Sequence, residues 1–244
     1  MKQGLFTVKG NTPLNALVYE MVLAGDTSAI TKAGQFVNLQ LAGKFLRRPI
    51  SVCDVNDGEL TLVYKVVGQG TRQMSEMKPG DTVDVLSGLG NGYDEQKAGE
   101  HVLLLGGGVG VPPLYLLAKR LQKAGKTVSV VLGFNKADEV FFEEEFKSLG
   151  AAVTVATADG SYGKKGFVTD VLPENYDYFY TCGPEPMLKA VYKATKTSGQ
   201  FSFEERMGCG FGACMGCSCK TVTGYKRICK DGPVLEKEEI LWDK

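Results

Sequence analysis

The sequence predicts an antiparallel β-barrel, then a parallel α/β domain, and a small cysteine-rich segment at the C-terminus. Over 1–97, short alternating or β-branched runs are separated by turn residues. Over 98–200, strand-like apolar runs alternate with helix-like runs, the pattern of a parallel sheet with crossover helices. Residues 201–244 hold five of the seven cysteines. We therefore expect three structural units with these boundaries.

The first unit is expected to contain six strands and one short helix. The strands cover 5–10, 16–24, 35–42, 48–55, 59–67 and 81–88, and the helical piece covers 71–77. Turn residues separate them, for example at Asp57-Gly58 and at Pro79-Gly80-Asp81. Six short strands at this spacing are typical of a small antiparallel barrel.

The second unit is expected to alternate strand and helix. Strands are predicted over 101–106, 127–134, 151–159 and 176–183, and helices over 111–125, 138–150 and 184–199. The first helix has two prolines in its opening turn, where an N–H has no helical partner, and it ends at a glycine. Because ligands of open parallel sheets bind beyond the carboxyl ends of the strands, the functional loops of this unit should follow its strands.

Composition argues against several classes of function. The 244 residues are 43% hydrophobic, so the chain can bury real cores. Basic and acidic residues both number 28, which argues against a broad nucleic-acid surface or a polybasic membrane patch. The apolar runs are too short and too often broken to span a bilayer, and no signal-peptide core follows the N-terminus. We expect a cytoplasmic protein with reduced thiols.

Three short motifs suggest nucleotide binding, each with an ordinary structural alternative. Gly106–Leu114 lets backbone approach a phosphate at a helix start, although it departs from G-x-G-x-x-G and such turns are common. Tyr180–Leu188 is either a second ligand loop or a plain helix start with a small buried cysteine. Arg48–Ser51 together with the turn Gly68–Thr71 is either a diphosphate clamp or a salt-bridged arginine and a routine turn.

The cysteines Cys209, Cys214, Cys217 and Cys229 have the spacing C-x4-C-x2-C-x11-C. The first three spacings are those of plant-type [2Fe–2S] ligation. The glycines between them suit a loop whose N–H groups wrap around cluster sulfurs. Zinc and unligated thiols are the alternatives. Cys219, two residues beyond Cys217, is expected to point away from the metal as a packed thiol.

Two single residues stand outside these motifs. His101 is the only histidine, and its place at the start of a strand indicates a structural role. Trp242 could anchor a partner or pack against the C-terminal segment, and the sequence leaves both interpretations open.

Over about residues 1–200 the motifs resemble, in order and spacing, those of the ferredoxin reductase-like flavoproteins. The matches are Arg48-Pro49-Ile50-Ser51, Gly68-Gln69-Gly70-Thr71, Gly106–Pro113 and Cys182-Gly183-Pro184. The resemblance implies that FAD is bound by Arg48, Pro49, Ile50, Ser51, Gly70 and Thr71, with Val63, Lys65 and Val67 along the flavin ring. It implies that the nicotinamide nucleotide is bound by Gly107, Gly108, Gly110, Cys182 and Gly183.

The order barrel, nucleotide domain and cysteine segment, with "ERMGCGFGACMGCSCK" and "CKDGPV", is similar to the electron-transfer subunits of NAD-dependent dihydroorotate dehydrogenases. One departure is a short run from Cys217 to Cys229, an abbreviated hairpin. The resemblance implies electron flow between a partner FMN subunit, which oxidises dihydroorotate, and NAD⁺ through [2Fe–2S] and FAD. It also implies an α2β2 heterotetramer acting in pyrimidine biosynthesis, with no residue of this chain catalytic toward dihydroorotate.

Other functions fit the same cofactors. The chain could be the reductase subunit of a sulfide, hydrogenase or ferredoxin system, or a zinc-stabilised module without catalysis. The stretch "GFNKADEV" after the strand over 127–134 favours NAD over NADP, because it offers acidic residues and only Lys136 rather than an arginine cluster for a 2′-phosphate.

Overall fold

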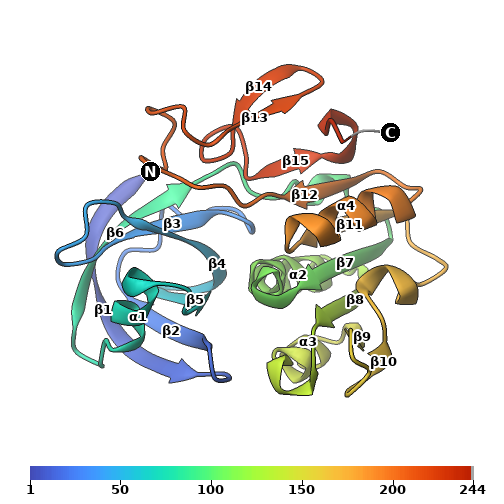
Figure 1. Cartoon of the computed structure of the whole chain (residues 1–244), viewed down its shortest axis with the longest axis horizontal. Coiled ribbons are helices and arrows are strands. Elements are labelled where there is room, and N and C mark those ends of the chain that lie inside the picture. The colour runs from blue at the N-terminus through green and yellow to red at the C-terminus, as the bar shows by residue number, and fades with distance from the viewer. Residues whose placement is uncertain (243–244) are drawn as a thin grey trace.

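The computed structural model describes residues 1–242 and confirms the predicted succession of barrel, parallel α/β sheet and C-terminal segment (Figure 1). Figure 1 shows the barrel and the sheet side by side, with the hairpin of the C-terminal segment lying above them. The C-terminal segment contacts both the barrel and the sheet.

The barrel is closed, with six strands in the order β1-β2-β5-β4-β3-β6 and antiparallel neighbours. The strands are β1 (Lys2–Pro13), β2 (Val18–Ala24), β3 (Phe36–Gln40), β4 (Arg48–Asn56), β5 (Glu59–Lys65) and β6 (Thr82–Leu89). Because side chains alternate along a strand, Val37 and Leu39 of β3 fill the barrel core. Phe36 and Asn38 point the other way, toward the C-terminal segment.

The short helix of the barrel, α1 (Gln69–Ser75), begins and ends two residues before the predicted piece. Its start is fixed by the Thr71 hydroxyl, which accepts hydrogen bonds from the Val67 and Gly68 amides at 2.9 and 3.2 Å. A threonine that binds the backbone just upstream closes the first turn and sets where the helix starts.

The second sheet has seven strands in the order β10-β9-β8-β7-β11-β12-β15. They are β7 (His101–Gly107), β8 (Thr127–Phe134), β9 (Ala152–Thr157), β10 (Lys164–Lys165), β11 (Tyr178–Cys182), β12 (Gly199–Ser202) and β15 (Val234–Glu236). All neighbours are parallel except β12 and β15. The central strands are apolar along most of their length, as expected for strands covered on both faces.

The helices of this unit are shorter than the sequence suggests: α2 (Tyr115–Lys123), α3 (Glu143–Ser148) and α4 (Glu185–Ala194). The prolines 112 and 113 lie in a 3₁₀ turn before α2 rather than in its first turn, so the α-helix begins only at Tyr115. Phe142 has a left-handed backbone (φ 68°), which interrupts the predicted helix and delays α3.

The C-terminal segment adds the hairpin β13 (Ser218–Thr221) and β14 (Gly224–Arg227), and then returns to the large sheet as β15. Strand β12 crosses residue 200, where we placed the end of the second unit, and β15 pairs with it from the third unit. The sequence did not indicate either strand, because four and three residues are too few for a periodic pattern.

Two apolar cores hold these parts together. The first core fills the barrel and continues to one face of the large sheet. It includes Leu117 of α2 and Val130 of β8. The second joins the other face of the sheet to the C-terminal segment, where Phe36 and Phe179 share a cluster with Cys217 and Cys229. Each large apolar side chain buried in this way contributes about 1.5–3 kcal/mol, so the cysteine segment is anchored by packing as well as by β15.

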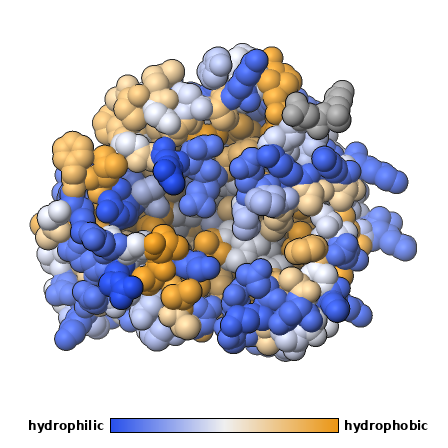
Figure 2. All heavy atoms as spheres, in the orientation of Figure 1, coloured by the Kyte–Doolittle hydropathy of each residue, from blue (hydrophilic) through white to orange (hydrophobic). Residues whose placement is uncertain are grey.

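The surface is mostly hydrophilic in the view of Figure 2, with apolar side chains gathered over the barrel near α1 and β2, on the side that faces the sheet. Leu17, just before β2, and Val67, just before α1, are exposed apolar residues of this region. Among residues 1–242, no helix is long and apolar enough to cross a bilayer.

Candidate functional site: a flavin strand, a nucleotide edge and four thiols

Arg48 and Gly70, two residues of the predicted diphosphate clamp, lie in contact in the fold. Arg48 opens β4 and its guanidinium lies against Gly70 at the start of α1. A Cβ built on Gly70 would come within 2.8 Å of the guanidinium carbon. Only a glycine therefore lets the cation reach the first turn of α1, where free backbone N–H groups favour an anion. A cation and open N–H groups in one cradle are the donor set that a diphosphate requires.

Thr71 contributes to this cradle by shaping it. Its hydroxyl is engaged with the amides of Val67 and Gly68 and donates to the Gly68 carbonyl at 3.2 Å. In this structure Thr71 holds the turn that presents Gly70, and a direct bond from Thr71 to a phosphate stays a prediction.

The predicted flavin strip runs along the strands β4 and β5, which are neighbours in the barrel. Pro49, Ile50 and Ser51 are partly buried on β4. Val63 is buried on β5, whereas Lys65 and Val67 are exposed at its end. The strip is therefore open to a ligand at its Lys65 end, beside the sheet.

The glycine loop and the Cys-Gly-Pro loop meet at one sheet edge, because β7 and β11 are parallel neighbours with Gly106 opposite Cys182. A Cβ on Gly110 would lie 2.6 Å from the Gly183 Cα, and one on Gly183 would lie 2.7 Å from the sulfur of Met187. The backbones of the two loops thus lie in close contact, without side chains between them. A dinucleotide can bind over such a surface at this end of the strands.

Cys182 lies at the end of β11, and burial raises the pKa of its thiol to about 12. The thiol is therefore neutral at physiological pH. A neutral thiol is a poor nucleophile, so Cys182 is better suited to contact the nicotinamide ring than to react with it.

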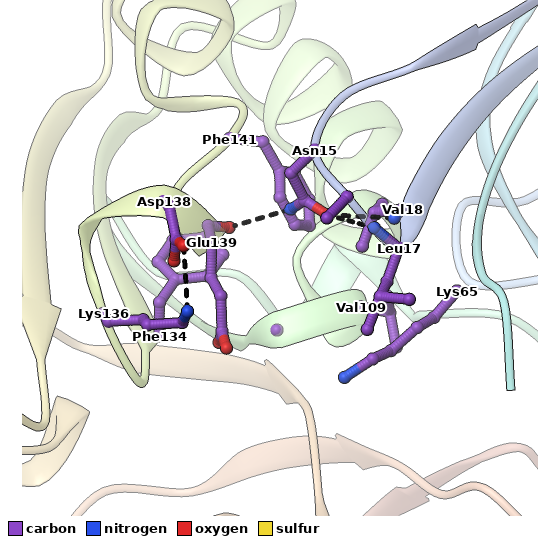
Figure 3. Close-up of a pocket in the computed structure, with 12 residues that line it drawn as sticks. Asn15, Leu17, Val18, Lys65, Val109, Phe134, Lys136, Asp138, Glu139 and Phe141 are labelled. Atoms are coloured by element: carbon purple, nitrogen blue, oxygen red, sulfur yellow. Dashed lines mark hydrogen bonds and ion pairs between the residues drawn. The ribbon is translucent and has the colours of Figure 1, made fainter.

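A cavity of ≈ 120 Å³ lies between the barrel and this edge of the sheet. Figure 3 shows Lys65 and Val109 on one side of it and Lys136, Asp138 and Glu139 on the other. The turn before β2 supplies Asn15 and Leu17, which the sequence analysis did not single out. No local pattern marks them, since they reach the site only through the pairing of β2 with β5.

The acidic side of this cavity holds its lysine in an ion pair. Lys136 Nζ lies 2.9 Å from Asp138 Oδ2, and this hydrogen bond raises the pKa of Lys136. Glu139 accepts a hydrogen bond from the Asn135 side chain at 2.8 Å. Two carboxylates next to one neutralised lysine suit the hydroxyls of a ribose and repel a 2′-phosphate.

The four predicted ligand cysteines form two pairs. In the first, the Cys209 sulfur accepts hydrogen bonds from the amides of Ala213 and Cys214 at 3.2 and 3.4 Å, and the Cys209 amide points to the Cys214 sulfur at 3.5 Å. In the second, the Cys229 amide points to the Cys217 sulfur at 3.4 Å. Two thiolates for each of two irons is the donor set of a [2Fe–2S] cluster.

A mononuclear zinc site has a different geometry, since it needs four ligands around one point. Within residues 1–242, no three His, Cys, Asp or Glu side chains are grouped closely enough to hold one metal ion. The two-by-two pairing of the four sulfurs matches the ligand set of a binuclear cluster.

The backbone around the first pair is built to receive negative sulfur. Burial raises the pKa of Cys209, but amides of Phe211, Cys214 and Ala213 outweigh it and lower the pKa to about 6. Gly210 and Gly212 have left-handed φ values of +77° and +93°. These conformations wrap the N–H groups around the sulfur, as the glycine-rich sequence suggested.

The second pair is deeper. Burial, with the nearby Cys217 thiol, raises the pKa of Cys229 to about 12 without a metal. Cys219 lies on β13 and packs against the second core, and burial raises the pKa of its thiol. Its role as a thiol that does not bind the metal stays a prediction.

The two isolated residues have ordinary environments. His101 is exposed, and its amide donates to Asp177 at 2.8 Å. Trp242 packs edge-on against Tyr192 and Phe201, with ring centroids 5.4 and 5.6 Å away. We expected Trp242 either to anchor a partner or to pack against the C-terminal segment, and the observed packing involves α4 as well as β12.

Two family models match parts of the chain. Residues 204–241 match the iron-sulfur cluster binding domain of dihydroorotate dehydrogenase B. Residues 104–193 match an oxidoreductase NAD-binding domain.

Similar curated proteins cover the whole chain. It is 46% identical to a protein of Geobacillus sp. (strain WCH70) over 99% of both chains. It is 44% identical to one of Bacillus pumilus (strain SAFR-032) over 98% of both. Both are named dihydroorotate dehydrogenase B (NAD(+)), electron transfer subunit.

Solved structures extend the likeness. A chain of an NADH-dependent reduced ferredoxin-NADP oxidoreductase, described for flavin-based electron bifurcation, superposes with a TM-score of 0.89 at 33% identity, over 98% of this chain and 91% of that one. The flavohem-like FAD/NAD binding domain of a Vibrio cholerae nitric oxide dioxygenase gives a TM-score of 0.65 at 24% identity, over 79% of this chain and 92% of that one, and shows the shared fold.

Proposed function

The chain belongs to the family of dihydroorotate dehydrogenase B electron transfer subunits, and we propose that it carries electrons between a dihydroorotate-oxidising partner and NAD⁺ in pyrimidine biosynthesis. The observation that carries the proposal is the pairing of four cysteine sulfurs, three from a glycine-lined loop and one after the β13–β14 hairpin, beside the barrel strand β3, which is the neighbour of β4. A flavin is the cofactor that converts the two-electron exchange of a nicotinamide into the single electrons that a cluster takes.

We assign the FAD diphosphate to Arg48 and to the N–H groups around Gly70. The arginine is held where a side chain at Gly70 would otherwise lie, which supports this assignment. The flavin ring is assigned to Pro49, Ile50, Ser51, Val63, Lys65 and Val67. These residues orient the ring between the barrel and the nucleotide edge.

NAD is assigned to the edge formed by Gly107, Gly108, Gly110, Cys182 and Gly183. The close backbone approach of the two loops supports this. Asp138 and Glu139 favour a free ribose hydroxyl over a 2′-phosphate, because Lys136 beside them is already paired with Asp138.

The cluster is assigned to Cys209, Cys214, Cys217 and Cys229. One iron would be held by the first two and the other by the last two, following the observed pairs. Cys219 is left as a packed thiol.

The names of the relatives imply a catalytic partner subunit. We propose that this partner contains FMN, that it oxidises dihydroorotate to orotate, and that the complex is an α2β2 heterotetramer in the cytoplasm, where thiol ligands stay reduced. On this proposal the present chain supplies no group to the organic substrate.

A reductase of the ferredoxin-NADP type is the second candidate, because one of its chains superposes with a TM-score of 0.89. The identity of 33% to that chain, against 46% to a dihydroorotate dehydrogenase subunit, favours the first candidate.

One experiment separates the two functions. The chain is co-expressed with the FMN-type catalytic subunit from the same genome, the complex is purified, and dihydroorotate-dependent reduction of NAD⁺ is measured. We expect a stable complex and a rate that requires both chains. Full oxidation of dihydroorotate by the chain alone, or no complex with that partner, contradicts the proposal. Iron and sulfide near two each per chain, roughly, confirm the cluster and exclude zinc.

A further inference from the structure

Asn38 lies between the flavin strand and the cluster loop. It points outward from β3, is 2% exposed, and faces Pro49 of β4 in the strand register. Its Nδ2 lies 3.4 Å from the carbonyl oxygen of Cys209, a ligand cysteine 171 residues further along the chain. Asn38 is thus one side chain that touches the cluster loop from the strand next to the flavin motif.

We propose that Asn38 is a positioning residue for electron transfer, which holds the Cys209 loop against the flavin side of the barrel and thereby sets the contact between the two redox sites. The inference rests on the proposed function only for the presence of a flavin and a cluster. It does not depend on which partner or substrate the complex uses.

The approach of the loop to Asn38 is as close as the backbone permits. Gly210 follows Cys209 with a left-handed φ of +77°. A Cβ added there would collide with the Asn38 amide nitrogen and lie 3.1 Å from its amide carbon. The glycine therefore serves this contact as well as the turn, and any other residue would push the loop away from the barrel.

The amide of Asn38 has one orientation. Nδ2 donates toward the Cys209 carbonyl, whereas the opposite orientation would set two acceptors against each other. Among residues 1–242, Oδ1 is then buried with no hydrogen-bond donor. A buried acceptor left unpaired costs about 1–3 kcal/mol, so this orientation of the Asn38 amide carries a cost to stability.

The strand beneath Asn38 is held firmly. Arg47 Nη1 donates to the Asn38 carbonyl at 3.2 Å and is paired with Asp84 at 2.6 Å. Gln3 donates to the same aspartate at 2.7 Å. Because the backbone of Asn38 is fixed from β1 and β6, the amide can act as a rigid support for the loop.

Two measurable properties should depend on this support. Hydrogen bonds and solvent exposure near the ligands tune the potential of an iron–sulfur cluster. Some residues do not bind the metal themselves but hold the metal-binding residues in place. Removal of such a residue typically changes metal affinity or activity by about 10–100-fold. The rate of transfer between flavin and cluster depends on their spacing, which the Asn38 contact constrains.

The test compares two Asn38 variants with a matched control in the full chain loaded with FAD and cluster. Asn38→Leu keeps four branched side-chain heavy atoms and removes the amide, and Asn38→Asp keeps the shape and removes the donor. The control is Gln40→Leu, an amide on the same outward side of β3 whose Nε2 donates to the Lys44 carbonyl at 2.8 Å. Rapid mixing with NADH follows flavin bleaching, freeze-quench EPR follows cluster reduction, and a redox titration gives the cluster midpoint potential.

We expect flavin reduction by NADH within about twofold of wild type in all three variants. In both Asn38 variants, cluster reduction should slow by about tenfold or more and the cluster potential should shift, while Gln40→Leu changes neither. Faster amide hydrogen exchange over 209–214 in the Asn38 variants would show directly that the loop opens more often than in the wild type.

Unchanged cluster reduction and unchanged potential in the Asn38 variants overturn the inference and leave Asn38 as packing. If Asn38→Leu fails to fold, Asn38→Asp decides by the same two readouts. The proposed function fails separately, when the wild-type chain with the FMN partner gives no dihydroorotate-dependent NAD⁺ reduction.

Discussion

The guanidinium of Arg48 occupies the space that a side chain on Gly70 would fill. These residues belong to different elements, β4 and α1, and their contact creates a cationic cradle at a helix start. If this cradle binds the FAD diphosphate, substitutions of Arg48 and of Gly70 should both weaken FAD binding. The first removes the charge, and the second adds a Cβ that displaces the guanidinium.

Arg48→Ala should weaken FAD binding by about 1.5–3 kcal/mol, the usual contribution of a charge-assisted hydrogen bond. Gly70→Ala should weaken it as well, because its Cβ displaces the arginine. Fluorescence titration of FAD into the flavin-free chain measures both. Arg72→Ala, an exposed arginine of the same helix, is the control and should bind FAD as wild type does.

Cys214→Ser should abolish the cluster while NADH-to-dye activity through FAD persists, because the thiol belongs to one of the two sulfur pairs. Cys219→Ser is its partner experiment and should keep both cluster and activity. Iron and sulfide assays with the visible spectrum decide. Cluster loss in Cys219→Ser would mean that the four ligands are wrongly assigned.

Gly110→Ala should raise the KM for NADH by about tenfold or more, because its Cβ would strike the Cys182–Gly183 backbone and distort the surface assigned to the nucleotide. FAD content and the flavin spectrum should stay normal, which separates a local change from misfolding. Gly10→Ala is the matched control, since its Cβ meets nothing within 4 Å. A normal KM in Gly110→Ala would place NAD elsewhere.

The wild-type chain should prefer NADH to NADPH, and Asp138→Ala should narrow that preference by releasing Lys136 from its ion pair. The measurement is the ratio of kcat/KM for the two nucleotides. Lys164→Ala, an exposed lysine of β10, is the control and should leave the ratio unchanged. A wild-type preference for NADPH would contradict the assignment of the acidic side of the cavity.

Glu20→Gln should stabilise the chain at neutral pH by a few tenths of a kcal/mol to about 1 kcal/mol, since the site is only partly buried. Burial and the nearby Glu145 carboxylate raise the pKa of Glu20 above 4.5. The folded state therefore binds the proton more tightly, and the carboxylate lowers stability as pH rises through the folded pKa. The gain should vanish near and below pH 4.5 in urea unfolding series, with the exposed Glu59→Gln as the control.

Much of the fold could be predicted because its signals are local. The six barrel strands and the strands β7, β8, β9 and β11 follow from alternating or apolar runs bounded by turn residues. Helix boundaries were less accurate, because the left-handed Phe142 and the 3₁₀ turn at Pro112 are conformations that a periodic pattern does not report.

The candidate site, like the fold, has parts that local sequence signals predict and parts that they do not. Each of the motifs, namely the cysteine spacing, the glycine loops and the Arg48 motif, is a short stretch of sequence that can be recognised by itself. The sequence alone therefore determined the kind of cofactors that the chain is built for. Their chemistry depends on residue type and short spacing, and both can be read directly.

Only the tertiary structure decided how these parts meet. Asn38 touches Cys209 across 171 residues, Leu17 and Lys65 share a cavity with Gly108, and Trp242 packs on Phe201. Such contacts arise from strand register, barrel closure and the return of β15 to the sheet, which no short window of sequence specifies. The sequence therefore predicted the residues of the redox sites, and the packing of the barrel, sheet and C-terminal segment brought β3, the neighbour of β4, against the Cys209 loop.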